Sequence, residues 1–253
     1  MLFIKPDWPA PAAIRAFTTL REGGVSLPPY NSLNLGTHVN DEITAVEINR
    51  QRVREHLKLP SEPFWLNQIH STLAIPVSLG AESRTADASY TSEKKQVCVV
   101  LTADCLPVLF CDRQGSQVAA THAGWKGLLE GVIEATLSHL SCAKNDILVW
   151  LGPAIGPASY EVGEEVRDQF LAKDPQNASA FIASRPGHWM MDLYQLARLC
   201  LKKQGINTVY GGEFCTFRES DRFYSYRRDG GSTGRMATLI YIADEDELHP
   251  TVR

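Results

Sequence analysis

The sequence feature that most restricts the fold is a pair of apolar runs separated by a short polar segment, between Pro107 and His122. This pattern is typical of two antiparallel strands joined by a tight turn. With Arg113 and Gln114 as the turn, the ladder places Cys105 opposite His122. Directly opposed residues have Cβ atoms about 4.5 to 5.5 Å apart. The register therefore predicts a thiolate and an imidazole close enough to share a metal ion.

An alternative interpretation is that both residues are structural, with Cys105 a buried thiol and His122 a hydrogen-bonded histidine at a strand end. The metal interpretation is favoured because the two residues form a facing pair at the mouth of a hairpin. Asp104 lies beside the pair, and Gly124 follows it at the start of an expected helix. We therefore expect a metal site at this end of the hairpin.

A third ligand is still required, and the sequence contains seven histidines. His70 stands out because Asn67, Gln68 and Ser71 make its surroundings polar within an otherwise apolar stretch that we expect to be a strand. The residues alone leave this choice open.

Apolar periodicity, glycine and proline predict the remaining elements. Helices are expected over 45–57, 125–140, 164–171 and 193–204, and strands over 96–101, 147–151 and 236–242. The mixture indicates an α/β or α+β fold. Because no repeat, low-complexity tract or linker divides the sequence, we expect one domain over residues 1–253.

Composition and charge argue against nucleic acid and membranes as binding partners. A formal net charge of -4 gives no broad positive surface for nucleic acid. The longest apolar run, 97–110, is interrupted by Asp104 and Pro107 and is shorter than the roughly 20 residues that span a bilayer. The first residues do not have the pattern of a secretory signal. We expect a cytoplasmic protein with reduced thiols, no membrane or nucleic-acid partner, and a small-molecule substrate.

A series of motifs closely resembles the family variously called laccase-domain, polyphenol-oxidase-like, peptidoglycan-editing factor or multifunctional purine nucleoside phosphorylase. The resemblance covers nearly the whole chain, with Lys126 where arginine is expected and Asn40 where glycine is usual. Its motifs are Thr19-Leu-Arg-Glu-Gly-Gly-Val-Ser26, Asn34-Leu-Gly-Thr-His-Val-Asn-Asp41, Asn67-Gln-Ile-His-Ser71, Thr102-Ala-Asp-Cys-Leu-Pro-Val108, Thr121-His-Ala-Gly-Trp-Lys-Gly127, Leu151-Gly-Pro-Ala-Ile-Gly-Pro157 and Phe223-Tyr-Ser-Tyr-Arg-Arg-Asp229.

The resemblance implies that His70, Cys105 and His122 are the metal ligands, and that they are catalytic together with Asp104. Three protein ligands with an open fourth position are typical of catalytic zinc, although copper is an alternative ion for such a soft site. The resemblance also implies an α+β fold with mixed sheets in a layered α/β/β/α sandwich.

The activities implied by the resemblance are phosphate-dependent cleavage of adenosine, inosine, guanosine and methylthioadenosine, and deamination of adenosine. Phosphorolysis needs an anion site, and helix N-terminal amides and arginine side chains both suit phosphate. Asn67 and Gln68 are further candidates for substrate contacts. The candidates for the anion are Arg21, Lys126, Arg227 and Arg228, although Arg227 and Arg228 could instead pair with nearby acids or with solvent.

Deamination needs a group that moves a proton. Asp104 or Asp87 could do so, although Asp104 could instead orient a ligand. The zinc-deaminase pattern, His-x-Glu followed by Pro-Cys-x-x-Cys, is absent from the sequence.

Three other functions remain as alternatives. The first is an amidase that removes L-serine from UDP-MurNAc-L-Ser, a peptidoglycan precursor. In such an enzyme Cys105 could in principle be the nucleophile, but a thiolate bound to zinc is occupied, so the metal role is favoured. The second is a copper polyphenol oxidase, which the small number of histidines disfavours. The third is a non-enzymatic zinc-binding protein, which would normally have a fourth protein ligand.

Overall fold

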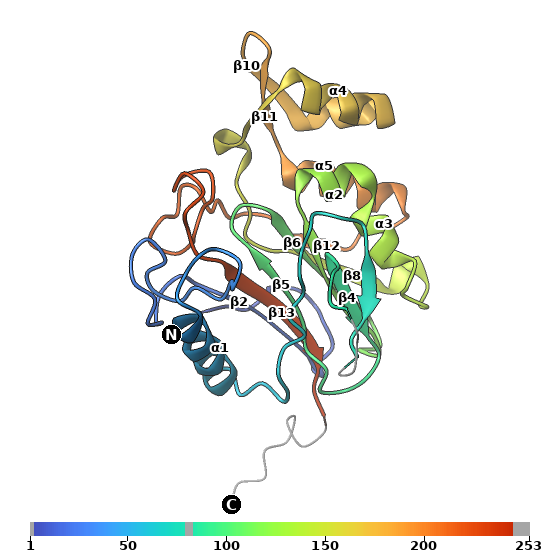
Figure 1. The fold of residues 1–253 in the computed structure, drawn as a ribbon. Coiled ribbons are helices and arrows are strands. Elements are labelled where there is room, and N and C mark those ends of the chain that lie inside the picture. The colour runs from blue at the N-terminus through green and yellow to red at the C-terminus, as the bar shows by residue number, and fades with distance from the viewer. Residues whose placement is uncertain (1–2, 79–82, 245–253) are drawn as a thin grey trace, which may run out of the picture.

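The computed structural model describes residues 3–78 and 83–244 (Figure 1). Two β-sheets pack face to face, and helices cover the outer face of each sheet. The layers run α/β/β/α, as the family resemblance implied, and the fold is α+β with a mixed sheet.

The first sheet has four antiparallel strands in the order β1-β2-β13-β5. Helix α1 (Ile43–His56) covers its outer face, where Val53 packs in one apolar cluster with Val99 and Leu239. The strands are β1 (Phe3–Ile4), β2 (Ile14–Thr19), β5 (Cys98–Thr102) and β13 (Met236–Ile242).

The second sheet has six strands in the order β12-β8-β6-β7-β4-β3. The pairs β12–β8 and β3–β4 are parallel and the other pairs are antiparallel, so this sheet is mixed. Its outer face is covered by α2 (Trp125–Glu130), α3 (Val132–Leu137) and α5 (Leu193–Lys203). The strands are β3 (Ala74–Pro76), β4 (Ala88–Thr91), β6 (Leu106–Asp112), β7 (Val118–Ala123), β8 (Ile147–Leu151) and β12 (Val209–Gly211).

Strand β6 is apolar on both faces because both are covered. Val108 and Phe110 pack with the helices of the outer layer, whereas Leu109 and Cys111 pack between the two sheets. This alternation follows from the period of two along a strand. Buried on both sides, such a strand reads as a continuous apolar run in the sequence.

A third sheet, in the order β10-β11-β9, extends from the sandwich together with α4 (Glu164–Lys173), at the top of Figure 1. Its strands are β9 (Glu161–Gly163), β10 (Phe181–Arg185) and β11 (His188–Met191), and the 3-10 turns of the chain are Lys144–Asp146, Pro157–Ser159 and Pro175–Ala180. Tyr160, directly before β9, contributes to the cavity described below.

The β6–β7 hairpin forms as predicted, but the predicted register is wrong by two residues. Pro107, not Cys105, lies opposite His122, and five residues, 113–117, connect the two strands. The physical reason is Asp112, whose carboxylate accepts hydrogen bonds from the amides of Ser116 (2.7 Å) and Gln117 (3.1 Å). A shift of two keeps every side chain on its predicted face.

The helix predicted over 125–140 is interrupted. Gly131 adopts φ +106°, in the left-handed region that favours glycine, and separates α2 from α3. The strand expected around His70 is also wrong, because His70 lies in a loop with φ +60°. The other predicted helices and strands are present, with ends shifted by at most a few residues.

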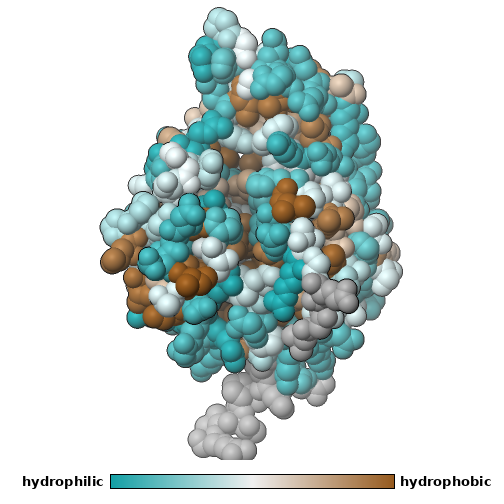
Figure 2. Space-filling model, in the orientation of Figure 1, coloured by the Kyte–Doolittle hydropathy of each residue, from teal (hydrophilic) through white to brown (hydrophobic). Residues whose placement is uncertain are grey.

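The surface in Figure 2 is mostly hydrophilic, with separate hydrophobic patches. Among the residues that the structure describes, no helix combines the length and the apolar character needed to cross a bilayer.

Candidate metal centre

Three segments bring the candidate ligands together. His70 lies in the loop before β3, Cys105 directly precedes β6, and His122 is near the end of β7. One ligand atom from each lies within 4.8 Å of the others, and the Cys105 sulfur is 3.8 Å from Nε2 of His70. His122 is buried and His70 is exposed, so the site opens to solvent on the His70 side.

The centre lies at one end of the space between the two sheets. Val118 and Ala120 on β7 pack between the sheets, and His122 follows them with the same two-residue period. Cys105 precedes Leu109 on β6 with that period too. This is why the two-residue error in register did not separate the predicted pair.

Asp87, a carboxylate with no exposed surface, organises the centre. Its Oδ1 lies 2.8 Å from Nδ1 of His122 and accepts the amide of His70 at 3.0 Å. Its Oδ2 accepts the amides of Ile69 and Ser71. Because Nδ1 of His122 is bound to this carboxylate, Nε2 is the nitrogen left for a metal ion. The same side chain holds the His70 loop in its left-handed conformation.

The charges of the centre favour the thiolate form of Cys105. Burial by itself raises the pKa of the thiol, but the neighbouring His122, with a contribution from His70, outweighs burial and lowers it. Burial also disfavours a charged His122, yet the Cys105 thiolate and Asp87 together raise the pKa of that imidazole. The thiolate is the form of cysteine that binds metals.

A cavity of about 570 Å³ contains the three candidate ligands. Its volume suits a small organic molecule. Lys126, Arg227 and Arg235 add positive charge to its wall, and Ile69 and Tyr226 add exposed apolar surface.

The structure brings some of the predicted substrate-binding residues to this cavity. Lys126 and Arg227 line it and are exposed. Gln68 lines it too, but its amide group exchanges two hydrogen bonds with the backbone of Leu101, at 2.7 and 2.8 Å. Gln68 therefore fixes the His70 loop to β5. Asn67 is not part of the cavity wall, and its side chain donates to Thr85.

Arg21 and Arg228 are outside the cavity wall, and the structure gives both a structural role. Arg21 donates to the carbonyl of Ser220 at 2.8 Å and lies over the ring of Tyr224. Arg228 donates to the carbonyls of Thr216 and Phe223 and forms an ion pair with Asp229. Their guanidinium groups stabilise loops.

Asp104, predicted to move a proton or to orient a ligand, is a positioning residue in the structure. Its carboxylate accepts the hydroxyls of Thr216 (2.6 Å) and Ser225 (3.0 Å) and the amide of Arg227 (2.7 Å). These bonds hold Thr216 and the 225–227 segment against Asp104, which directly precedes Cys105.

Sequence reasoning did not single out several residues of the cavity wall, among them His38, Thr102, Tyr160, Tyr226 and Arg235. His38 and Tyr226 lie within the family-like motifs 34–41 and 223–229, so the motifs held a signal for them. Tyr160 and Arg235 lie outside the motifs and are brought to the site by tertiary structure.

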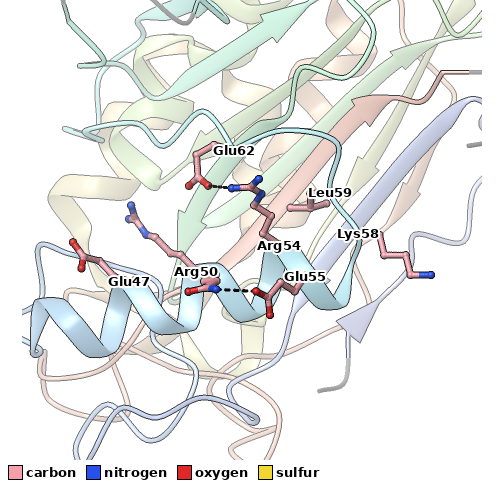
Figure 3. A pocket seen from close by; sticks show the side chains of 8 residues that line it. Glu47, Arg50, Arg54, Glu55, Lys58, Leu59 and Glu62 are labelled. Atoms are coloured by element: carbon pink, nitrogen blue, oxygen red, sulfur yellow. Dashed lines mark hydrogen bonds and ion pairs between the residues drawn. The ribbon is translucent and has the colours of Figure 1, made fainter.

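A larger hollow of about 760 Å³ lies beside α1 (Figure 3). Its polar side chains interact with one another: Arg54 forms an ion pair with Glu62 at 3.7 Å, and Gln51 donates a hydrogen bond to Glu55 at 2.8 Å. It contains none of the three candidate ligands, so the smaller cavity is the better candidate for chemistry.

Known proteins are similar to this chain over nearly its whole length. The family model described as multi-copper polyphenol oxidoreductase laccase matches residues 15–243. A purine nucleoside phosphorylase of Pseudomonas aeruginosa is 51% identical over 96% of this chain and 99% of its own. The Escherichia coli purine nucleoside phosphorylase YfiH is 49% identical over 94% and 98%.

Solved structures of similar proteins have the same fold as this chain. The crystal structure of a Neisseria meningitidis protein superposes with a TM-score of 0.92 at 49% identity, covering 96% of this chain and 99% of that one. YlmD of Geobacillus stearothermophilus superposes with a TM-score of 0.84 at 32% identity, covering 93% and 94%.

Proposed function

The chain belongs to the multi-copper polyphenol oxidoreductase laccase family, and on that premise we propose that it is a zinc-dependent purine nucleoside phosphorylase. The observation that carries the proposal is the convergence of His70, Cys105 and His122 in one cavity with three cationic side chains. Relatives about half identical to this chain are named purine nucleoside phosphorylases.

The residues present fit a zinc ion. Two imidazoles and a thiolate are donors that zinc prefers, and three protein ligands leave one position open. Gly124 keeps the neighbouring space free, because a Cβ atom there would lie 3.0 Å from Cδ2 of His70 and 3.1 Å from the Cys105 sulfur. This is the single group of three or more potential donors within residues 3–78 and 83–244, which suits one ion better than a multinuclear copper cluster.

A bound zinc ion would supply a positive charge that orients and polarises an oxygen of the substrate. Asp87 keeps the His122 ring fixed for this role, and the cationic side chains attract phosphate. In the reaction, a phosphate oxygen attacks C1′ of the ribose while the bond from C1′ to the purine nitrogen breaks. The proton of the hydrogen phosphate passes to the purine nitrogen, so the products are the free base and the 1-phosphate of the sugar, which is ribose 1-phosphate for inosine.

The proposed nucleosides are adenosine, inosine, guanosine and methylthioadenosine. All four present a flat purine ring. Ile69 and Tyr226, which are 52% and 54% exposed, line the cavity and offer apolar surface against which such a ring can pack.

Adenosine deamination is a second proposed activity, and it ranks below phosphorolysis. Deamination needs a group that moves a proton. The carboxylates of Asp104 and Asp87 are both occupied by several hydrogen bonds. Neither is free to serve as a proton carrier in this geometry.

The alternative substrate is UDP-MurNAc-L-Ser, from which an amidase would remove L-serine. The observation that favours it is the same set of cations, because the exposed Lys126 and Arg227 also suit a diphosphate.

Product analysis by mass spectrometry tests the proposal. Zinc-loaded protein should convert inosine to hypoxanthine and ribose 1-phosphate when phosphate is present, and should release no base without it. His122→Ala should lose the bound zinc and the turnover. Base release without phosphate would indicate a hydrolase. Inert inosine together with release of serine from UDP-MurNAc-L-Ser would replace the phosphorylase proposal with the amidase.

A further inference from the structure

Arg235, directly before β13, is a partly buried cation that lines the cavity. Its Nη1 donates to the carbonyls of Thr233 (2.9 Å) and Gly234 (3.1 Å). Across the described part of the chain, neither Nε nor Nη2 has a hydrogen-bond partner, and no carboxylate forms an ion pair with the guanidinium. The guanidinium also lies over the ring of Tyr226, and the negative charges of Cys105 and Asp104 act on it without bonding to it. Leaving donors of a partly buried cation unpaired is unfavourable. The two free donors therefore indicate an anion that the protein binds.

The loop 34–38 positions this guanidinium. Asn34 accepts the backbone amides of both Arg235 and Gly36 at 2.9 Å. A Cβ atom at Gly36 would lie 2.8 Å from Cγ of Arg235 and 3.4 Å from Cε1 of His38. The missing side chain at Gly36 thus lets Arg235 and His38 converge.

His38 has an N–H to offer an anion. Its side chain has no hydrogen-bond partner within the described residues, and it lines the same cavity. Burial and the neighbouring charges of Arg235 and Arg50 lower the pKa of His38. A neutral imidazole keeps one N–H donor.

Thr102 supplies another unused polar group to the same cavity. Its hydroxyl is buried and has no partner in the part of the chain that the structure describes. Because Thr102 pairs with Met236 in the sheet, it lies beside the residue that follows Arg235. An unpaired buried hydroxyl is uncommon and calls for a ligand or a water molecule.

The carboxylate of the cavity wall already has its own hydrogen-bond partners. Asp104 is the one carboxylate among the described residues of the cavity wall, and three donors occupy it. Arg227 also lines the wall, but its Nη1 is held by the carbonyl of Glu161 at 2.8 Å and its guanidinium lies over the Tyr160 ring. Arg227 and the exposed Lys126 suit attraction of an anion from solvent.

We propose that Arg235, assisted by His38 and Thr102, forms the binding site for the phosphate co-substrate. Nε and Nη2 of a guanidinium form a fork that matches two phosphate oxygens. The identity of the anion rests on the proposed function, whereas the site itself rests on the unpaired groups described above. Of the three arginines that the sequence singled out, Arg21 and Arg228 lie outside the cavity wall and are not required for it.

Binding of inorganic phosphate to zinc-loaded, nucleoside-free protein tests the site by calorimetry. Arg235→Gln should weaken binding about tenfold or more, since hydrogen bonds to charged groups are the strong ones. Arg235→Lys keeps the charge but loses the forked pair of donors, so its phosphate affinity should lie between those of the parent protein and Arg235→Gln. Arg54→Gln is the matched control because it removes the same charge in the other hollow, and it should stay within about twofold.

His38→Gln provides a second variant that should fold normally, because the His38 side chain makes no hydrogen bond within the described residues. It should weaken phosphate binding severalfold, and thermal melting should match the parent protein. In phosphorolysis of inosine, Arg235→Gln should raise the KM for phosphate about tenfold and leave the KM for inosine within about twofold.

The outcomes separate this inference from the proposed function. If Arg235→Gln and His38→Gln bind phosphate normally while inosine is still phosphorolysed, the site is wrong and the phosphorylase proposal stands. If the parent protein binds phosphate, Arg235→Gln does not, and no nucleoside is cleaved, the site stands and the phosphorylase proposal fails. If Arg54→Gln lost as much phosphate affinity as Arg235→Gln, the loss would come from the change in net charge, and the proposed site would be wrong.

Discussion

At the scale of single residues, Asp87 determines the geometry of the candidate metal centre. It contacts His122 directly and reaches His70 through the backbone amides of the loop. One carboxylate thereby sets the tautomer of one imidazole and the position of another, while Cys105 is placed by the strand that follows it. The burial of Asp87 makes this arrangement rigid.

We expect Asp87→Asn to lower zinc affinity about 10- to 100-fold, the usual effect of losing a hydrogen-bonded carboxylate behind a histidine ligand. Competition with a chromophoric chelator measures the affinity. Asp112→Asn is the matched control, since Asp112 is also a buried carboxylate but lies at the turn end of the β6–β7 hairpin, where it binds the turn instead of a candidate ligand. Unchanged affinity in Asp87→Asn, or an equal loss in Asp112→Asn, would contradict the role given to Asp87.

At the scale of the elements, the sequence predicted what depends on local patterns. Strands β8 and β13 have the predicted bounds because each is a compact apolar run. The break at Gly131 was missed because glycine is also tolerated inside a helix. The turn length was missed because it depends on hydrogen bonds of Asp112 across five residues.

Local sequence patterns predicted less of the candidate site than of the fold. The hairpin made the approach of Cys105 to His122 predictable, although not the exact register, since a hairpin is local in sequence. His70 was identifiable only by resemblance, because its loop is held by Asp87, 17 residues away. Arg235 approaches His38 only in the folded protein, and no local pattern reports such a contact.

Helix caps provide a prediction at this scale. Asp192, at the start of α5, accepts the amide of Gln195 at 3.0 Å, whereas Glu42, at the start of α1, makes no such bond. Asp192→Ala should lower the free energy of unfolding by about 1 kcal/mol, and Glu42→Ala by no more than about 0.5 kcal/mol. Urea denaturation followed by circular dichroism measures both. Equal losses would show that the cap bond does not stabilise α5.

At the scale of the whole molecule, the apolar layer between the two sheets holds the sandwich together. Leu109, Cys111 and Trp150 from the larger sheet meet Val100 and Ile240 from the smaller one. The candidate metal centre lies at one end of this layer, so the same packing that stabilises the fold also fixes the distance between the strands that carry the site.

Leu109→Ala should therefore lower the free energy of unfolding by about 2 to 5 kcal/mol, since Leu109 has no exposed surface and its truncation leaves a cavity. Ile182→Ala, at a position that is 71% exposed on β10, should change it by less than about 0.5 kcal/mol. Chemical denaturation compares the two. A small effect of Leu109→Ala would mean that the sheets do not depend on this layer.

Strand β13 has a consequence for biosynthesis. It is the last described strand in chain order, yet it lies between β2 and β5 in the smaller sheet. On the ribosome, β2 and β5 emerge long before the strand that joins them, and each keeps an unpaired edge that can associate with another chain. Arg235 emerges together with β13. A nascent chain therefore acquires a continuous four-stranded sheet and a complete cavity in one late step, and an unfinished chain has neither.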